Sequence, residues 1–292
     1  MKLLKRFGLI ASTLLLIFSV LLAKKNTSVI QAQSGTCQAD FQSVAIPLTE
    51  LGSQQYIRMD GQSTEFTGGL YPNGLNTRPV AHERSGELAS KAIKPLNLAG
   101  NPDPAHGKIV MISIGMSNTN YEFETFIRTV QNNEAINPHL MFVNGALPGQ
   151  TSDRWIDPQA PAWQALSDTL DQYQVSAAQV QVAWIKLTRT GAGDFPAKAQ
   201  ELETDLVQIV HNLYTAYPNV KIVYFSSRIY SYTYYNGLSP EPNAYEGGFA
   251  VKWLLERQNK NNKALNNDSA KGAITAPFLS WGPYLWANGE IA

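Results

Sequence analysis

The residue best suited to covalent chemistry in this sequence is Ser117, in the segment Gly115-Met116-Ser117-Asn118-Thr119. This segment follows the apolar run 108–114 and precedes a helical pattern. A serine on such a turn can act as a nucleophile, because the amino terminus of the helix favours developing negative charge. Ser117, Asn118 or Thr119 could instead cap the helix, a common role for these residue types. Both interpretations place Ser117 at a strand-to-helix turn.

Other polar residues follow the later apolar runs in the same way. Gly149 lies in the loop after the second run, where its backbone amide could donate to an oxyanion, or where it is an ordinary loop glycine. Lys186 ends the third run and is either a second oxyanion-stabilising group or a solvated lysine. Arg228 and Tyr230 follow the fourth run. With Asn118, these two residues are the predicted substrate contacts.

The pattern after residue 106 predicts alternating strands and helices. Nearly continuous apolar runs are typical of strands buried on both faces. Helical spacing of apolar residues separates these runs. Such alternation predicts an α/β domain with a mainly parallel sheet, whose strand ends meet at one edge and bind ligands there. The predicted strands are 108–114, 139–143, 180–185 and 220–225, and the predicted helices are 120–131, 162–173, 197–216 and 245–260.

Residues 1–32 have the pattern of an export signal. Basic residues precede Phe7–Ala23, a stretch without charge, and small residues that suit a signal peptidase follow. The alternative is an uncleaved membrane anchor, because this stretch is at the lower limit for spanning a bilayer. We therefore expect a periplasmic or extracellular protein that contacts a membrane only if the segment is retained. Residues 33–106 are rich in turn-forming residues and predict a loop-rich extension packed on the domain 107–292.

Charge and cysteine content exclude several classes of function. The chain has 23 basic and 23 acidic residues, and residues 1–32 hold five basic and no acidic ones, so 18 against 23 remain, a net charge of −5. This balance argues against nucleic acid as a partner. A single cysteine, Cys37, permits no internal disulfide. No metal-ligand motif, P-loop or dinucleotide motif is present, so we expect no metal and no cofactor.

These residues together resemble the SGNH (GDSL-type) hydrolase superfamily over about 107–230. Gly115-Met116-Ser117 matches two residues of its Gly-Asp-Ser block, and Gly149 matches its oxyanion glycine. Lys186 stands about where the family has an oxyanion asparagine, which is a departure. The resemblance implies a flavodoxin-like three-layer sandwich and an exported hydrolase of esters, such as acyl esters of carbohydrates. The family's Asp-x-x-His block does not occur before Ala292, so we expect the domain to be incomplete at its carboxyl end.

The absence of that block leaves the serine without an evident base. His106 and His139 fall near the starts of strands, and His211 is expected on a solvated helix face. His82, followed by Glu83, is the remaining candidate base, because the extension could bring it to the site. A serine without an adjacent base is a poor nucleophile. We therefore expect little or no esterase activity.

A non-catalytic carbohydrate-binding module is the alternative function. Amphipathic aromatic rings suit the faces of sugars and could line a cleft, although about half of them are expected in the core. The oligomeric state is not predicted. The aromatic residues concerned are Tyr224, Tyr230, Tyr232, Tyr234, Tyr235, Tyr245, Trp253, Trp281, Tyr284 and Trp286.

Overall fold

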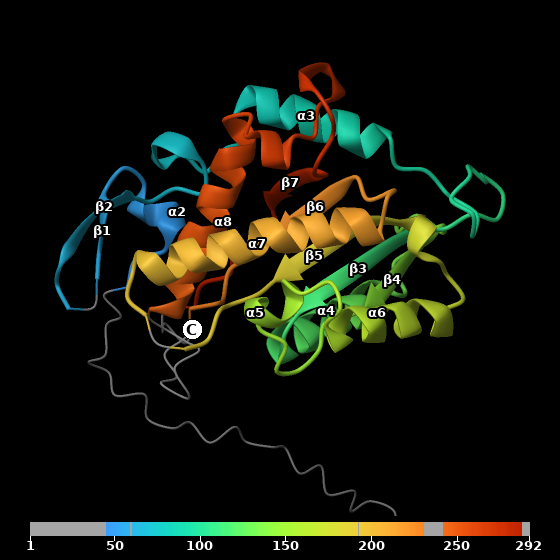
Figure 1. The fold of residues 1–292 in the computed structure, drawn as a ribbon, viewed down its shortest axis with the longest axis horizontal. Coiled ribbons are helices and arrows are strands. Elements are labelled where there is room, and N and C mark those ends of the chain that lie inside the picture. Colours follow the sequence, from blue (N-terminus) through green and yellow to red (C-terminus); the bar gives the residue numbers. More distant parts are fainter. Residues whose placement is uncertain (1–44, 59, 192, 231–241, 288–292) are drawn as a thin grey trace, which may run out of the picture. The chain divides into compact units, whose positions relative to one another are not determined.

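The structure is a computed structural model that describes residues 45–58, 60–191, 193–230 and 242–287 (Figure 1). The predicted signal or anchor, residues 1–32, lies outside these ranges. Within them, no helix has both the length and the apolar character needed to cross a membrane.

A five-stranded parallel sheet forms the centre of the fold. Its strands are β3 (Ile109–Gly115), β4 (Leu140–Asn144), β5 (Val180–Lys186), β6 (Ile222–Phe225) and β7 (Phe278–Trp281). They are hydrogen-bonded in the order β4-β3-β5-β6-β7, and every pairing is parallel. This is the flavodoxin order, in which the chain reverses direction across the sheet between β3 and β5. The predicted α/β, flavodoxin-like fold class is confirmed, and β7 is a strand that the sequence pattern did not predict.

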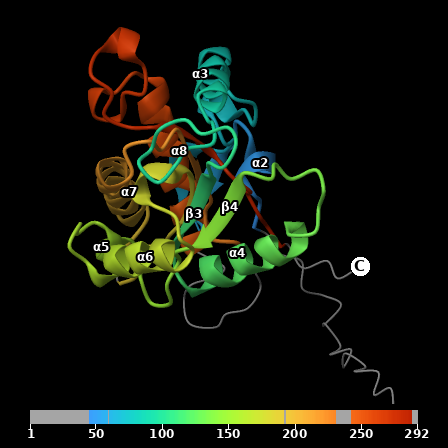
Figure 2. The same ribbon diagram turned by 90° about the vertical axis from the view of Figure 1, so that its right-hand side faces the viewer.

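Helices cover both faces of the sheet and give three layers (Figure 2). Trp184 of β5 stacks on Phe123 of α4 (Ser117–Val130), with ring centroids 5.7 Å apart. Its neighbour Ile185 belongs to a core cluster with side chains of α6 (Pro161–Gln172), α7 (Ala197–Ala216) and α8 (Asn243–Asn259). Successive strand residues point to opposite faces. Helix α4 therefore covers one face, and α6, α7 and α8 cover the other.

Helix α7 shows why the periodicity of the sequence was informative. Its bounds, Ala197–Ala216, are those that the apolar spacing predicts. Leu202, Leu206, Ile209 and Leu213 are buried against the sheet at helical spacing. The four predicted helices correspond to α4, α6, α7 and α8, with small differences at their ends.

The extension before the sheet contains more regular structure than its turn-rich sequence suggests. It holds α2 (Leu48–Leu51), the hairpin β1 (Gln55–Ile57) and β2 (Ser63–Thr67), and the twelve-residue helix α3 (Val80–Lys91). Helix α3 buries only His82 and Gly86, which explains why apolar spacing did not reveal it.

Side-chain hydrogen bonds fasten this extension to the domain. The backbone N–H of Leu48 donates to the hydroxyl of Tyr284 at 3.0 Å, and that of Ile46 donates to the hydroxyl of Tyr245 at 2.9 Å. Lys252 of α8 donates to the carbonyl of Thr67 at 3.0 Å. The extension therefore packs on α8 and on the segment that follows β7.

Candidate functional site

Ser117 is the first residue of α4 and follows β3 at the carboxyl edge of the sheet. The turn before it is tight. A Cβ at position 115 would lie 2.6 Å from the carbonyl oxygen of Lys186, so only glycine fits there. The hydroxyl of Thr119 donates to the same carbonyl at 2.7 Å. These contacts fix the start of α4 against the end of β5.

The side chains of Ser117 and Asn118 are not used to cap the helix. The N-cap residue is Met116, which provides no side-chain hydrogen bond, so the capping interpretation is wrong. Both side-chain amide atoms of Asn118 are inaccessible to solvent and have no hydrogen-bond partner. Unpaired buried polar atoms cost free energy, so each one calls for an explanation, of which a role in binding or catalysis is one.

The loop that carries Gly149 lies beside this turn. The N–H of Leu147 donates to the carbonyl of Gly115 at 3.0 Å, which joins the loops after β3 and β4. Gly149 itself is exposed, with φ +75°, a conformation that favours glycine. The geometry thus brings the loops of Ser117 and Gly149 to one edge of the sheet.

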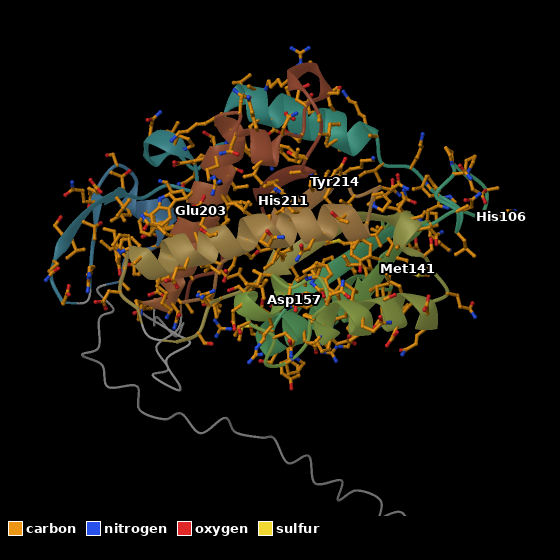
Figure 3. The ribbon with its side chains drawn as sticks, in the orientation of Figure 1. His106, Met141, Asp157, Glu203, His211 and Tyr214 are labelled. Atoms are coloured by element: carbon orange, nitrogen blue, oxygen red, sulfur yellow. The ribbon has the colours of Figure 1, made fainter. Side chains whose placement is uncertain are left out.

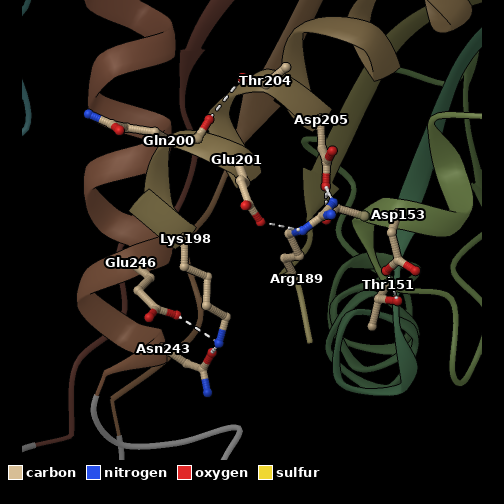
Figure 4. A network of polar contacts seen from close by, with 11 residues as sticks. Thr151, Asp153, Arg189, Lys198, Gln200, Glu201, Thr204, Asp205, Asn243 and Glu246 are labelled. Atoms are coloured by element: carbon tan, nitrogen blue, oxygen red, sulfur yellow. Dashed lines mark hydrogen bonds and ion pairs between the residues drawn. The ribbon is translucent and has the colours of Figure 1, made fainter. Parts of the chain in front are cut away.

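A polar network anchors the far end of the Gly149 loop. Ser152 is fully buried, and its hydroxyl donates to Asp205 of α7 at 2.7 Å. Arg189, in the loop after β5, forms ion pairs with Asp205 at 2.6 Å and with Glu201 at 3.0 Å (Figure 4). The loops after β4 and β5 are therefore both fastened to α7.

Lys186 is buried, and its ammonium group forms an ion pair with a carboxylate. It is 2 % exposed, and its Nζ donates to both carboxylate oxygens of Glu122 in α4 at 2.7 Å. Burial lowers the pKa of Lys186, and the charge of Glu122 opposes that effect. The solvated alternative is wrong, and the ammonium is held by a partner that the sequence analysis did not single out.

Arg228 and Tyr230 follow β6 and have different environments. Burial lowers the pKa of Arg228, and the negative charge of Glu122 opposes this. Arg228, Lys186 and Glu122 therefore interact electrostatically at the carboxyl edge. The ring of Tyr230 stacks on Trp286, with centroids 4.4 Å apart, and Tyr230 is 6 % exposed. Its ring face is thus used in packing.

His82 does not lie with Ser117. It is buried in α3, and its ring centroid lies 4.5 Å from that of Phe278, the first residue of β7. This position is at the amino end of the strand, whereas Ser117 follows the carboxyl end of β3. Burial lowers the pKa of His82 to about 4, and its Nε2 has no hydrogen-bond partner.

The other histidines are also placed away from Ser117. His139 Nδ1 lies 2.9 Å from the carbonyl of Gly107, at the amino edge of the sheet. His211 Nε2 lies 2.7 Å from the carbonyl of Ala264, so the predicted solvated environment of His211 is wrong. His106, labelled in Figure 3, is exposed and precedes β3, at the end of that strand opposite to Ser117. None of the four histidines, all of which the structure describes, lies beside Ser117.

An open groove of about 650 Å³ lies on the face of the sheet that α4 covers. Lys186, Glu122, Ser226 and Leu285 contribute to it. We call it the aromatic groove, because six rings line it: Tyr121, Phe123, Phe126, Trp184, Tyr224 and Trp281.

The remaining aromatic residues of the predicted cleft lie elsewhere. Tyr245 is buried against Tyr56 and Phe249. Tyr232, Tyr234 and Tyr235 lie outside the described residues. In the described ranges, no group of three or more His, Cys, Asp or Glu side chains could hold a metal ion.

Comparison with known proteins gives little further information. No family model matches the chain, and no curated protein matches it. Among solved structures it is similar to the periplasmic domain of a lipopolysaccharide acetyltransferase from Salmonella ser. Paratyphi A. That likeness has a TM-score of 0.32 and 11 % sequence identity, and covers 70 % of this chain and 77 % of the other. A similarity of this size assigns no function.

Proposed function

We propose that the chain is an exported, SGNH-type acyl-ester hydrolase in which Ser117 is the nucleophile. The observation that carries the proposal is the position of Ser117 on the first turn of α4, at the carboxyl edge of a flavodoxin-like sheet. Ligands bind at this edge in folds of this type. Support also comes from the neighbouring Gly149 loop and from the unpaired amide of Asn118.

The chemical step would be attack by Ser117 Oγ on an ester carbonyl carbon. A bond forms between Oγ and that carbon, the ester C–O bond breaks, and the serine proton leaves to solvent while the alcohol is released protonated. Backbone amides of Ser117 and Gly149 would stabilise the oxyanion. Water then hydrolyses the acyl-serine. Turnover should be slow, because the four histidines lie away from Ser117.

The test is covalent labelling with a fluorophosphonate, followed by mass spectrometry. Because no histidine lies beside Ser117, we expect slow labelling, with a single adduct on Ser117 that is absent from Ser117→Ala and retained in Ser167→Ala, a variant of an exposed serine in α6. Hydrolysis of p-nitrophenyl acetate should remain close to the uncatalysed rate. An adduct at another residue, or none on folded protein, would refute the proposal. Rapid hydrolysis that is lost in His82→Ala would show that His82 supplies the base.

A carbohydrate-binding module without catalysis is the second candidate. The observation that favours it is the aromatic groove, since rings such as Tyr121 and Phe126 are 71 % and 40 % exposed. Calorimetric titration with acylated and deacylated oligosaccharides distinguishes the two functions. Equal affinity for both, without labelling of Ser117, would favour the binding module.

A further inference from the structure

The polar groups in the floor of the aromatic groove are paired with one another. Lys186 donates to Glu122, and the indole N–H of Trp184 donates to the hydroxyl of Ser226 at 2.9 Å. A bound sugar would find a hydrogen-bond partner mainly in Glu122, whose side chain is 31 % exposed, and its other hydroxyls would face aromatic rings, which is costly. A hydrocarbon chain needs no such partners and can contact the rings while leaving the Glu122 carboxylate in water. The chemistry of the groove therefore fits a hydrocarbon chain better than a sugar.

The groove begins close to the candidate nucleophile. Ser117 starts α4, and the next turns of the same helix supply Tyr121, Glu122 and Phe126 to the groove wall. From Ser117 to Phe126 the helix advances about 14 Å, at about 1.5 Å per residue. Asn118 lies one turn before Glu122 on the same helix face. A ligand could therefore extend along α4 from the serine into the groove.

We propose that the aromatic groove binds the hydrocarbon chain of a medium-length acyl ester whose carbonyl lies at Ser117. This assignment rests on the proposed function for the carbonyl end only. The groove volume of about 650 Å³ lies in the usual range for small-molecule sites. The exposed rings of Tyr121 and Phe126 form part of its wall, and clustered exposed apolar side chains are typical of binding surfaces. The substrate class is thus an ester of a medium-chain fatty acid.

The experiment measures binding without requiring turnover. Trp184 and Trp281 line the groove, so ω-bromodecanoate bound there quenches their fluorescence by contact with the bromine. We expect saturable quenching that decanoate reverses by competition and that sodium bromide does not reproduce. Ser167→Ala, a variant of an exposed serine in α6, should bind as tightly as the wild-type protein. If ω-bromodecanoate does not quench saturably, the proposal is overturned.

Two positions on α4 give a matched pair of variants. Thr125 lines the groove, whereas Thr129, one turn later, does not, and each hydroxyl donates to the carbonyl four residues before it. Thr125→Trp should weaken binding about tenfold or more by filling the groove, and Thr129→Trp should change it less than about twofold. Leu285→Lys, on another part of the groove wall, gives a second test if Thr125→Trp does not fold.

The outcomes separate this inference from the proposed function. Equal effects of the two tryptophan variants would overturn the inference, and so would saturable quenching that survives Leu285→Lys and Thr125→Trp. Labelling of Ser117 without decanoate binding would refute the proposal that the aromatic groove binds an acyl chain, and it would leave the hydrolase proposal intact. Decanoate binding without labelling of Ser117 would refute the hydrolase and support a chain-binding groove.

Discussion

The buried imidazole of His82 makes a quantitative prediction about stability and pH. Its pKa is about 4 in the folded protein, against an ordinary value of 6.5. The cause is burial beside Phe278 in a site that solvent scarcely reaches, since His82 is 4 % exposed. Between these pH values the unfolded chain binds a proton that the folded protein does not bind. The free energy of unfolding must therefore rise with pH across this range.

The size of the effect follows from the two pKa values. At about 1.4 kcal/mol for each pH unit, protonation of His82 in the unfolded chain removes about 3 kcal/mol from the free energy of unfolding between pH 6.5 and pH 4. That is a large part of the stability of a typical domain. The variant His82→Leu replaces the imidazole with an apolar side chain of similar size and so removes the titrating group.

The assay is urea unfolding, followed by tryptophan fluorescence, at several values between about pH 4 and pH 7. The stability of His82→Leu should depend on pH less steeply than that of the wild-type protein. His106→Gln, a variant of an exposed histidine, is the control and should keep the wild-type slope. If His82→Leu and the wild-type protein lose stability in parallel as the pH falls, His82 is not a buried neutral histidine.

Three further variants test the carboxyl edge. Glu122→Gln leaves the buried Lys186 without a counterion and should lower the free energy of unfolding by about 2–4 kcal/mol, whereas Lys186→Met leaves a carboxylate that is 31 % exposed and should cost about 1 kcal/mol or less. Urea unfolding measures both, and equal losses would contradict the asymmetry. Gly115→Ala places a Cβ 2.6 Å from the carbonyl of Lys186, so it should cost about 1–3 kcal/mol and reduce fluorophosphonate labelling of Ser117. Unchanged stability and labelling would contradict the tight turn.

The layered core was predictable from the sequence because burial imposes periodicity. Every residue of β5 is buried, so the strand reads as an apolar run, interrupted only by Gln181, that ends at Lys186. Helix α7 carries its apolar residues on one face. Strand β7 has only four residues, and such a short run lacks the length that distinguishes a strand from a loop. Helix α3 packs on the sheet through a histidine and a glycine, which no hydrophobic pattern records.

Hydrogen bonds and ion pairs between side chains far apart in the sequence could not be predicted from the sequence. Strand order decides that Lys186 reaches Glu122, 64 residues earlier in the chain. The sequence located Lys186 at the carboxyl edge but gave no sign that it is paired. In the same way, it left His82 as a possible base, because only the packing of α3 on Phe278 decides which edge of the sheet His82 occupies. Local patterns located the loops of the site, and tertiary contacts decided which side chains remain available in them.

The bonds that fasten the extension to the domain also constrain how the chain can fold. The bond between Ile46 and Tyr245 spans 199 residues, and that between Leu48 and Tyr284 spans 236. Contacts of such sequence separation form slowly, because a long loop must close before they are made. A ribosome makes the chain from its amino end, so α2 cannot pack on Tyr245 and Phe249 of α8 until that helix has been synthesised, and its bond to Tyr284 forms later still. We therefore expect the contacts of α2 to be completed late in synthesis, after α8 and Tyr284 have been made.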